Sequence, residues 1–302
     1  MERGSRLSLV NRRLFLNLGL SAFAALFVLA CAAQTVIYET TSRFGAIIVT
    51  ESPDGLRTLM FERDGARQSA VKMGDPDHLE LPYARVAMAG LALCEEPRRI
   101  LVVGLGGGTL PTFLRRHYPT ATIDAVDIDP KVVDVAKRFF GFREDERMRA
   151  YVEDGRRFIE RVAQGTYDVI FLDAFGTEAV PSHLTTQEFL RAVRRALNPR
   201  GVAVGNVWKR SSNRLYDSMV RTYREVFEEL HLVDVVQDVN MMVFALPRRQ
   251  ALSRNELAEL ASKLSAAKQF RFDLGEFVHQ GYVLAQDHFR GGQVLRDRNS
   301  NQ

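Results

Sequence analysis

The chain has 302 residues, 46% of them hydrophobic and 26% charged; these globular proportions exclude a disordered chain, a collagen and a polytopic membrane protein. Lys and Arg number 41 against 37 Asp and Glu, and the net charge of +4 is concentrated in the first 33 residues, so it indicates no nucleic-acid partner. The two cysteines, Cys31 and Cys94, are too few for a disulfide framework or a cysteine-rich metal site.

Residues 1–33 have the pattern of a signal peptide or a membrane anchor, because arginines precede a long apolar run. Residues 11–17 (NRRLFLN) resemble a twin-arginine export motif. Residues 30–32 (ACA) offer a cleavage site and residues 28–31 (VLAC) resemble a lipobox that would acylate Cys31, so cleavage, lipidation and an uncleaved anchor all remain open. The positive-inside rule predicts an exported or membrane-anchored protein on the extracytoplasmic side, with a cytoplasmic location as the alternative.

Residues 34–97 predict a small domain of β-hairpins followed by a linking helix. Two Asp-Gly pairs, typical of tight turns, separate short runs that are rich in β-branched residues. The predicted antiparallel strands are Thr35–Thr41, Phe44–Glu51, Leu56–Glu62 and Ala66–Lys72. Leu79–Leu93 then shows the apolar spacing of a helix.

Residues 98–290 alternate strands with helices, which predicts a parallel sheet covered by helices on both faces. The predicted strands are Ile100–Val103, Thr122–Val126, Arg149–Val152, Tyr167–Leu172, Val202–Val207, Leu232–Val236 and Met241–Leu246. The predicted helices are Leu110–His117, Lys131–Phe140, Arg156–Ala163, Thr185–Leu197, Asn213–Leu230 and one that begins at a capping box in Ser253–Glu256. Residues 291–302 read as a polar tail.

Four of these strands end in residues suited to a nucleoside. The loop Gly104–Thr109 (GLGGGT) exposes backbone N–H groups at a helix start. Asp127 ends the next strand, where a carboxylate can accept both hydroxyls of a ribose. Asp154 is placed to accept a hydrogen bond from an adenine amino group, and Asp173 ends the fourth strand. The loop lacks the Gly-Lys-Ser/Thr of an NTPase and the third glycine of an NAD-binding fingerprint, so both classes are disfavoured.

With these motifs, the sequence from Tyr38 to about Leu246 resembles spermidine synthase, the polyamine aminopropyltransferase family, which has the S-adenosylmethionine-dependent methyltransferase fold. The resemblance implies an α/β fold with a seven-stranded Rossmann-like sheet behind a small antiparallel N-terminal sheet. Family members bind decarboxylated S-adenosylmethionine and pass its aminopropyl group to putrescine. They are commonly dimers or tetramers, so the resemblance also implies a homo-oligomer.

The resemblance assigns roles to individual positions. It implies catalytic roles for Asp173 and Tyr83, the tyrosine acting as a substrate gate. The positions that it implies for donor binding are Gln68, Gly104, Gly106, Gly108, Asp127 and Asp154.

Three departures from the family pattern affect substrate contacts. Gly107 stands where the family has an aspartate that grips the propylamine nitrogen of the donor. Gly176 stands where a second aspartate helps to deprotonate the attacking amine, and Ala84 replaces a Gln or His. Because a dicationic diamine needs carboxylates to offset its desolvation, these losses weaken its recognition.

The sequence therefore predicts an enzyme, a spermidine synthase-like transferase with decarboxylated S-adenosylmethionine or S-adenosylmethionine as co-substrate and a small-molecule acceptor such as a polyamine. A methyltransferase and a non-catalytic nucleoside- or polyamine-binding protein remain open as alternatives.

The six histidines show no metal spacing, so no metal is expected. His183 is expected to bond to backbone in its loop, and Glu178 is expected to be a solvated carboxylate. Membrane contact is expected only through the N-terminal segment.

Overall fold

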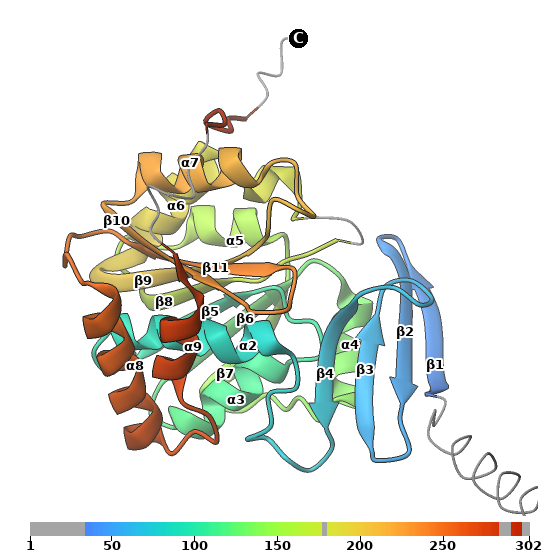
Figure 1. Cartoon of the computed structure of the whole chain (residues 1–302). Helices are drawn as coiled ribbons and strands as arrows, with labels where there is room; N and C mark the ends of the chain where they lie inside the picture. Colours follow the sequence, from blue (N-terminus) through green and yellow to red (C-terminus); the bar gives the residue numbers. More distant parts are fainter. Residues whose placement is uncertain (1–33, 177–179, 284–290, 298–302) are drawn as a thin grey trace, which may run out of the picture.

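A computed structural model describes residues 34–176, 180–283 and 291–297, which form two sheets (Figure 1). The first is antiparallel, with the order β1-β2-β3-β4. Its strands, which confirm the four predicted runs, are β1 (Thr35–Ser42), β2 (Gly45–Glu51), β3 (Leu56–Met60) and β4 (Arg67–Lys72). Gly55 at φ +80° and Asp64 at φ +58° supply the left-handed positions that these turns require.

The second sheet has eight strands in the order β12-β10-β11-β9-β8-β5-β6-β7. The five strands from β9 to β7 in that order are parallel, while β11, β10 and β12 are antiparallel to their neighbours. The strands are β5 (Arg99–Val103), β6 (Thr122–Asp127), β7 (Met148–Val152), β8 (Tyr167–Leu172), β9 (Leu197–Trp208), β10 (Glu229–Asp234), β11 (Asn240–Leu246) and β12 (Tyr282–Val283). The predicted fold class is confirmed, and the two-residue β12 adds an eighth strand to the seven expected.

Helices cover both faces of this sheet. One face carries α2 (Pro82–Ala87), the 3₁₀ helix η1 (Met88–Leu93), α3 (Thr109–His117), α8 (Arg254–Lys268) and α9 (Leu274–Gly281). The other carries α5 (Gly155–Arg161), α6 (Gln187–Ala196) and α7 (Tyr216–Val226), with the short η2 (Ser182–Leu184) before α6.

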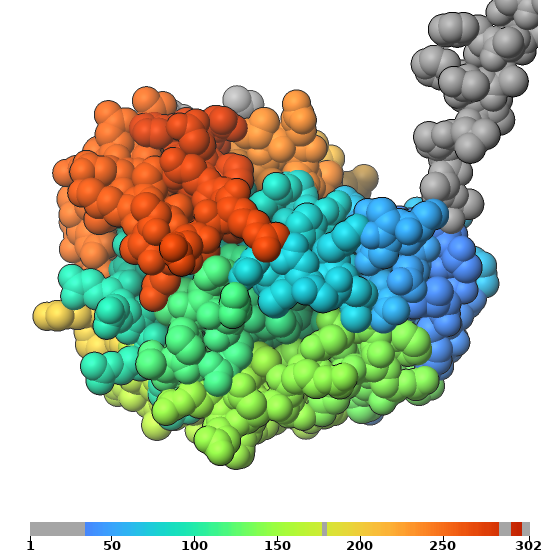
Figure 2. Space-filling view, turned by 90° about the horizontal axis from the view of Figure 1, so that it is seen from below, coloured from blue at the N-terminus to red at the C-terminus, as the bar shows by residue number. Residues whose placement is uncertain are grey.

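The N-terminal sheet joins the rest of the molecule through α4 (Pro130–Phe139). Ile47, Val49 and Leu59 of the sheet form an apolar cluster with Val132 and Val135 of this helix. Figures 1 and 2 show the blue N-terminal sheet and the green segment that contains α4 side by side. This cluster therefore packs the N-terminal sheet against α4.

Two predicted helices are wrong in extent. Leu79–Leu93 is not one helix, because α2 begins only at Pro82 and gives way at Met88 to the tighter η1. The helix predicted over Asn213–Leu230 covers only α7, since Glu229 and Leu230 pair with Leu246 and Ala245 of β11. In both cases tertiary packing overrides an apolar spacing that suits a longer helix.

The helix caps follow the sequence more closely. Ser253 and Glu256 form the predicted capping box of α8. Thr186, rather than Thr185, caps α6 by accepting a hydrogen bond from the N–H of Phe189. The hydroxyl of Thr185 instead donates to the carbonyl of Ser182 at 2.7 Å.

The described part of the predicted tail, residues 291–297, contacts the helices. The carbonyl of Leu295 accepts a hydrogen bond of 2.7 Å from the N–H of Gln187. Asp297 pairs with Arg156 on α5. The predicted signal or anchor in residues 1–33 lies outside the described residues. Across the described ranges, no helix combines the length and apolar character needed to span a bilayer.

We predict that Gly90→Ala destabilises the fold by about 1–3 kcal/mol, the usual cost of overfilling a packed core. Gly90 lies in η1, and an added Cβ would be 2.5 Å from Cγ2 of Val204 and 3.1 Å from Cδ1 of Phe244. Urea unfolding measures the effect. Lys263→Ala, on the exposed side of α8, is the control and should change stability by less than about 0.5 kcal/mol. Equal stability of wild type and Gly90→Ala would contradict this close packing.

Candidate active site

A cavity of about 330 Å³ lies between the N-terminal sheet with α2 and the carboxyl ends of β5, β6 and β8. This is the edge at which open α/β sheets bind ligands. The structure brings seven of the eight predicted site residues to its wall: Gln68, Tyr83, Gly104, Gly106, Asp127, Asp154 and Asp173. Gly176 and His183 line it as well, whereas Glu178 lies outside the described residues.

Gly108 does not line the cavity, so the structure does not place it with the predicted donor-binding residues. It is the N-cap of α3 with φ +74°, and an added Cβ would lie 2.7 Å from the ring of Phe142. Gly104 has a different constraint, since its φ is +100° and an added Cβ would lie 2.3 Å from the carbonyl oxygen of Asp173. Glycine at 104 therefore allows the β5 loop to approach the end of β8 closely.

Asp127 holds the glycine loop in place. Its Oδ2 accepts a hydrogen bond of 3.0 Å from the N–H of Leu105, and its Oδ1 accepts one of 2.9 Å from the N–H of Asp129. Burial raises the pKa of this carboxyl, and the backbone hydrogen bonds oppose that rise. Each oxygen has a second lone pair, so the carboxylate retains the capacity to accept ribose hydroxyls at the cavity wall.

Asp154 has two partners within the protein. Its Oδ1 accepts a hydrogen bond of 3.0 Å from the N–H of Arg157 and so caps α5. Its Oδ2 lies 2.8 Å from Nε2 of His183. Burial alone would raise the pKa of Asp154, but the hydrogen bonds from Arg157 and His183 lower it. The expectation that His183 bonds to backbone is wrong for its ring, because Nε2 donates to this ionised carboxylate.

Asp173 lies at the floor of the cavity between two donors. The hydroxyl of Tyr83 donates to its Oδ2 at 3.0 Å, and Nδ2 of Asn206 donates to its Oδ1 at 2.8 Å. Burial raises the pKa of Asp173 to about 7, against the opposing effect of these two hydrogen bonds. The part of its surface that remains accessible faces the cavity. Asp173 can therefore exchange a proton near neutral pH with a group bound in the cavity.

Tyr83 remains a hydrogen-bond donor in this arrangement. Burial and the neighbouring charge of Asp173 raise the pKa of its hydroxyl well above the ordinary value. Tyr83 is thus neutral at physiological pH, and its O–H can only donate to Asp173 while that carboxyl is ionised. The pair predicted from the sequence, Asp173 and Tyr83, is in direct contact.

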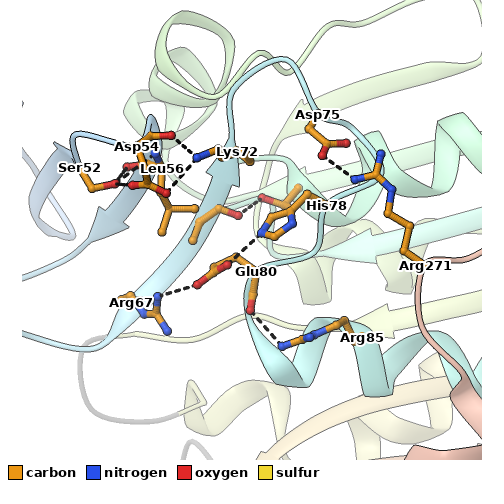
Figure 3. A network of polar contacts seen from close by, with 12 residues as sticks. Ser52, Asp54, Leu56, Arg67, Lys72, Asp75, His78, Glu80, Arg85 and Arg271 are labelled. Carbon is orange, nitrogen blue, oxygen red and sulfur yellow. Dashed lines mark hydrogen bonds and ion pairs between the residues drawn. The ribbon is translucent and has the colours of Figure 1, made fainter.

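A polar network outside the predicted residues includes one residue of the cavity wall, Glu80 (Figure 3). Glu80 lines the cavity, and its carboxylate contacts Nε2 of His78 at 2.9 Å and Nη1 of Arg67 at 3.4 Å. The hydrogen bond from His78, with the charges of His78 and Arg67, lowers the pKa of Glu80 against the effect of burial. Arg271 also reaches back to Asp75 at 2.6 Å, and this ion pair ties the segment before α2 to the C-terminal helices.

The charge of the wall favours a cationic ligand. Five carboxylates line the cavity, and within the described parts of the chain no Lys or Arg does so. Those five are Glu80, Asp127, Asp129, Asp154 and Asp173. Apolar side chains such as Ile128 and Leu184 supply the remaining surface that a purine ring needs. A sulfonium nucleoside has both properties, so the donor predicted from the sequence fits this cavity.

Glu80, Asn206 and Asn240 are not among the site residues predicted from the sequence. Asn206 is 4% exposed and Asn240 is 6% exposed, and they hydrogen bond to each other behind Asp173. The available signal was an asparagine within the apolar run Val202–Val207, since a buried amide requires a partner. Glu80 gave no such signal, because a carboxylate just before a helix is common.

Residues 83–237 match the family model described as Spermine/spermidine synthase domain. The chain is 38% identical over 241 residues to the Polyamine aminopropyltransferase of Vibrio vulnificus, and the match covers 76% of this chain and 79% of that protein. A crystal structure of a probable spermidine synthase from Corynebacterium glutamicum shares the fold, with a TM-score of 0.71 at 20% identity over 89% of this chain and 99% of that one. Human Methyltransferase-like protein 13 in complex with SAH has a TM-score of 0.57 at 33% identity over 63% of this chain and 93% of that one.

We predict that Asp173→Asn stabilises the fold at pH 8 but not near pH 4. The pKa of Asp173 rises from 3.8 to about 7, so between these values the folded chain binds a proton that the unfolded chain releases. Stability must then fall as pH rises through this window, by at most about 4 kcal/mol for a rise of three pKa units.

Urea unfolding of both proteins at pH 4.5, 6 and 8 measures this difference. Asp134→Asn, at an exposed position of α4, is the control and should show no such trend. A stability difference for Asp173→Asn that does not change with pH would show that Asp173 titrates normally.

Proposed function

The chain belongs to the spermine/spermidine synthase family, a family of transferases, and we propose that it transfers the aminopropyl group of decarboxylated S-adenosylmethionine to an amine of a polyamine such as putrescine. The observation that carries the proposal is Asp173, a carboxyl with a pKa of about 7 held between Tyr83 and Asn206 at the floor of an acidic cavity. By the family resemblance, we also propose that the protein acts as a homo-oligomer.

Asp173 supplies the base that this reaction needs. An ammonium group must lose a proton before its nitrogen can attack the carbon next to the sulfonium sulfur. The C–N bond then forms as the C–S bond breaks, and the electron pair of the C–S bond leaves on the neutral thioether. Burial makes Asp173 a stronger base than an ordinary aspartate, and the proton passes to its carboxylate. The rest of the site aligns the two reactants and excludes water.

The donor would lie along the glycine loop. We propose that Asp127 accepts the ribose hydroxyls, because it ends β6 at the cavity wall and is fixed by two backbone N–H groups. Ile128 is 37% exposed where it lines the cavity, and this apolar surface suits the face of the adenine. Asp154 can reach the adenine amino group only alongside His183, so histidine and donor share one carboxylate.

A methyltransferase is the second candidate, and it is favoured by the surroundings of Gly107. An added Cβ at this position would lie 2.7 Å from the ring of Phe140 and 2.8 Å from Oγ of Ser69. The place of the family's amine-gripping aspartate is therefore filled by other side chains. Without that aspartate, selection of the decarboxylated donor must rest on other groups. The similarity to Methyltransferase-like protein 13 supports the same alternative.

We predict that the full-length protein binds decarboxylated S-adenosylmethionine at least about tenfold more tightly than S-adenosylmethionine, since a free carboxylate on the donor would meet the acidic wall without a counter-charge. Isothermal titration calorimetry with each donor measures this preference. Asp127→Ala should weaken binding by about tenfold or more, the loss expected for a hydrogen bond to a charged group.

Asp134→Ala, on the exposed face of α4, is the matched control and should bind like wild type. Tighter binding of the intact donor would favour the methyltransferase. If neither donor bound at millimolar concentration, the transferase proposal would be abandoned for a non-catalytic pocket.

We further propose that residues 1–33 direct the chain to the extracytoplasmic side, as an exported or membrane-anchored protein. A fusion of residues 1–40 to a reporter that is active only outside the cytoplasm should give signal. Replacing Arg12 and Arg13 by lysine should reduce that signal if the twin-arginine motif is read. If the wild-type fusion gave no signal although the protein was present in the cytoplasm, the proposal would be contradicted and a cytoplasmic location favoured.

A further inference from the structure

Three side chains form a hydrogen-bonded line that leads away from the cavity floor. Nδ2 of Asn240 donates to Oδ1 of Asn206 at 2.7 Å, and Nδ2 of Asn206 donates to Oδ1 of Asp173 at 2.8 Å. Both asparagines are almost fully buried, and neither is among the described residues that line the cavity. Burying two amides among apolar strands costs free energy unless each is hydrogen-bonded, so each asparagine requires its partner in this line.

The strand register explains why the two amides meet. β9 and β11 are antiparallel, and Asn206 stands opposite Met242, two residues beyond Asn240. Asn206 and Asn240 are therefore diagonal neighbours on one face of the sheet, within reach of each other's side chains. Asp173 follows the end of β8, the parallel neighbour of β9 on its other side. The line thus crosses three adjacent strands at the same edge of the sheet.

Both ends of this line favour one direction for its hydrogen bonds, since an ionised Asp173 carboxylate only accepts and Asn240 donates. An asparagine amide has one accepting and one donating end, and either end can face a given neighbour. Because Asn240 presents its NH2 group to Asn206, the accepting oxygen of Asn206 turns toward β11. Its NH2 group must then face Asp173. If Asn240 offered no donor, the amide of Asn206 could turn over when Asp173 is protonated and accept a hydrogen bond from the carboxyl O–H, which would favour the neutral form of Asp173.

We propose that Asn240 is a positioning residue for the transfer reaction, because it holds the amide of Asn206 in the one orientation that donates a hydrogen bond to the Asp173 carboxylate. The link to catalysis rests on the proposed function, whereas the effect on Asp173 rests on the geometry alone. A hydrogen bond to the ionised carboxyl favours its charged form and lowers its pKa. Asn240 therefore keeps Asp173 available as a base near neutral pH.

Other groups near Asp173 also affect its protonation. Tyr83 on α2 donates to its second oxygen, and the charge of Asp238, in the turn between β10 and β11, contributes to the raised pKa of Tyr83. Across the cavity lie Glu80, Asp127, Asp154 and His183. The side chain of Asn240 donates to Asn206, so a change at Asn240 removes that hydrogen bond while all of these groups remain in the chain.

The test is direct titration of Asp173 in the full-length protein without substrate. Carbon-13 NMR of protein labelled at its aspartate carboxyl carbons follows each carboxyl, and the Asp173 signal is the one that Asp173→Asn removes. Asn206→Leu should raise the pKa of Asp173 by about one unit, the effect of losing one such hydrogen bond. Asn240→Leu should raise it in the same direction, by at least half as much.

A double-mutant cycle identifies the route of the effect. If Asn240 acts through Asn206, adding Asn240→Leu to Asn206→Leu should cause no further shift. Met242→Leu changes packing on the same face of β11 and should leave the titration unchanged. Should Asn240→Leu fail to fold, Asn240→Ala removes the same donor with less added bulk. An unshifted Asp173 in a folded Asn240 variant, or additive shifts in the cycle, would overturn the proposal.

The activity measurement separates this proposal from the proposed function. In Asn240→Leu, the acid limb of the kcat/KM profile should move to higher pH with the shift seen by NMR in the free protein, while KM for the donor stays within about twofold. A one-unit shift from pH 7 would lower kcat/KM at pH 7 about fivefold. If wild type shows no transfer with either donor but the NMR shift occurs, the proposed function fails and the effect on Asp173 stands. If transfer occurs without the shift, only the positioning role fails.

Discussion

The structure must hold one carboxyl at the floor of a cavity without a cation beside it, although burial disfavours the charged form of that group. Asp173 meets this requirement because a hydroxyl from α2 and an amide from β9 donate to its two oxygens. Neither donor is charged, so the hydrogen bonds only partly offset the burial of the carboxylate. The close approach of the β5 loop at Gly104 completes the floor, since any side chain at that position would strike the Asp173 backbone. Residues far apart in the sequence are therefore fixed relative to one another by the surroundings of a single carboxyl.

The other carboxyls of the cavity wall have different partners from those of Asp173. Backbone N–H groups of the β5 loop and of the α5 N-terminus bond to Asp127 and Asp154, and these hydrogen bonds favour the charged form of each carboxyl. Glu80 is kept ionised by His78 and Arg67, which lie outside the cavity wall. The negative charge is thus set by the fold before any ligand arrives, and its compensating groups mostly sit behind it. The carboxylates and their partners therefore need to move little when a cationic ligand binds. This preorganisation favours a cation over a neutral or anionic ligand.

The sequence predicted the elements that have local signals and failed where distant contacts decide. The Asp-Gly turns located the N-terminal hairpins, and the capping box located the start of α8. The helix predicted over Leu79–Leu93 failed because Gly90 packs so closely on Val204 and Phe244 that the segment tightens into η1. Strand-end carboxylates could be found because parallel strands end at one edge. Asn206 and Asn240 could not, since their meeting depends on the register between β9 and β11.

Gly107, one of the positions that depart from the family pattern, is closely surrounded by other side chains. Ser69 on β4 and Phe140 after α4 both reach the place of its missing side chain. Ser69 is further fixed by a contact of 2.8 Å with the hydroxyl of Thr109, and Phe140 belongs to the apolar cluster that joins the N-terminal sheet to α4. An aspartate at position 107 would have to displace both, so its loss is built into the packing between the two sheets rather than confined to one position. The cavity wall at Ser69 is therefore shaped by the same contacts that hold the two parts of the molecule together.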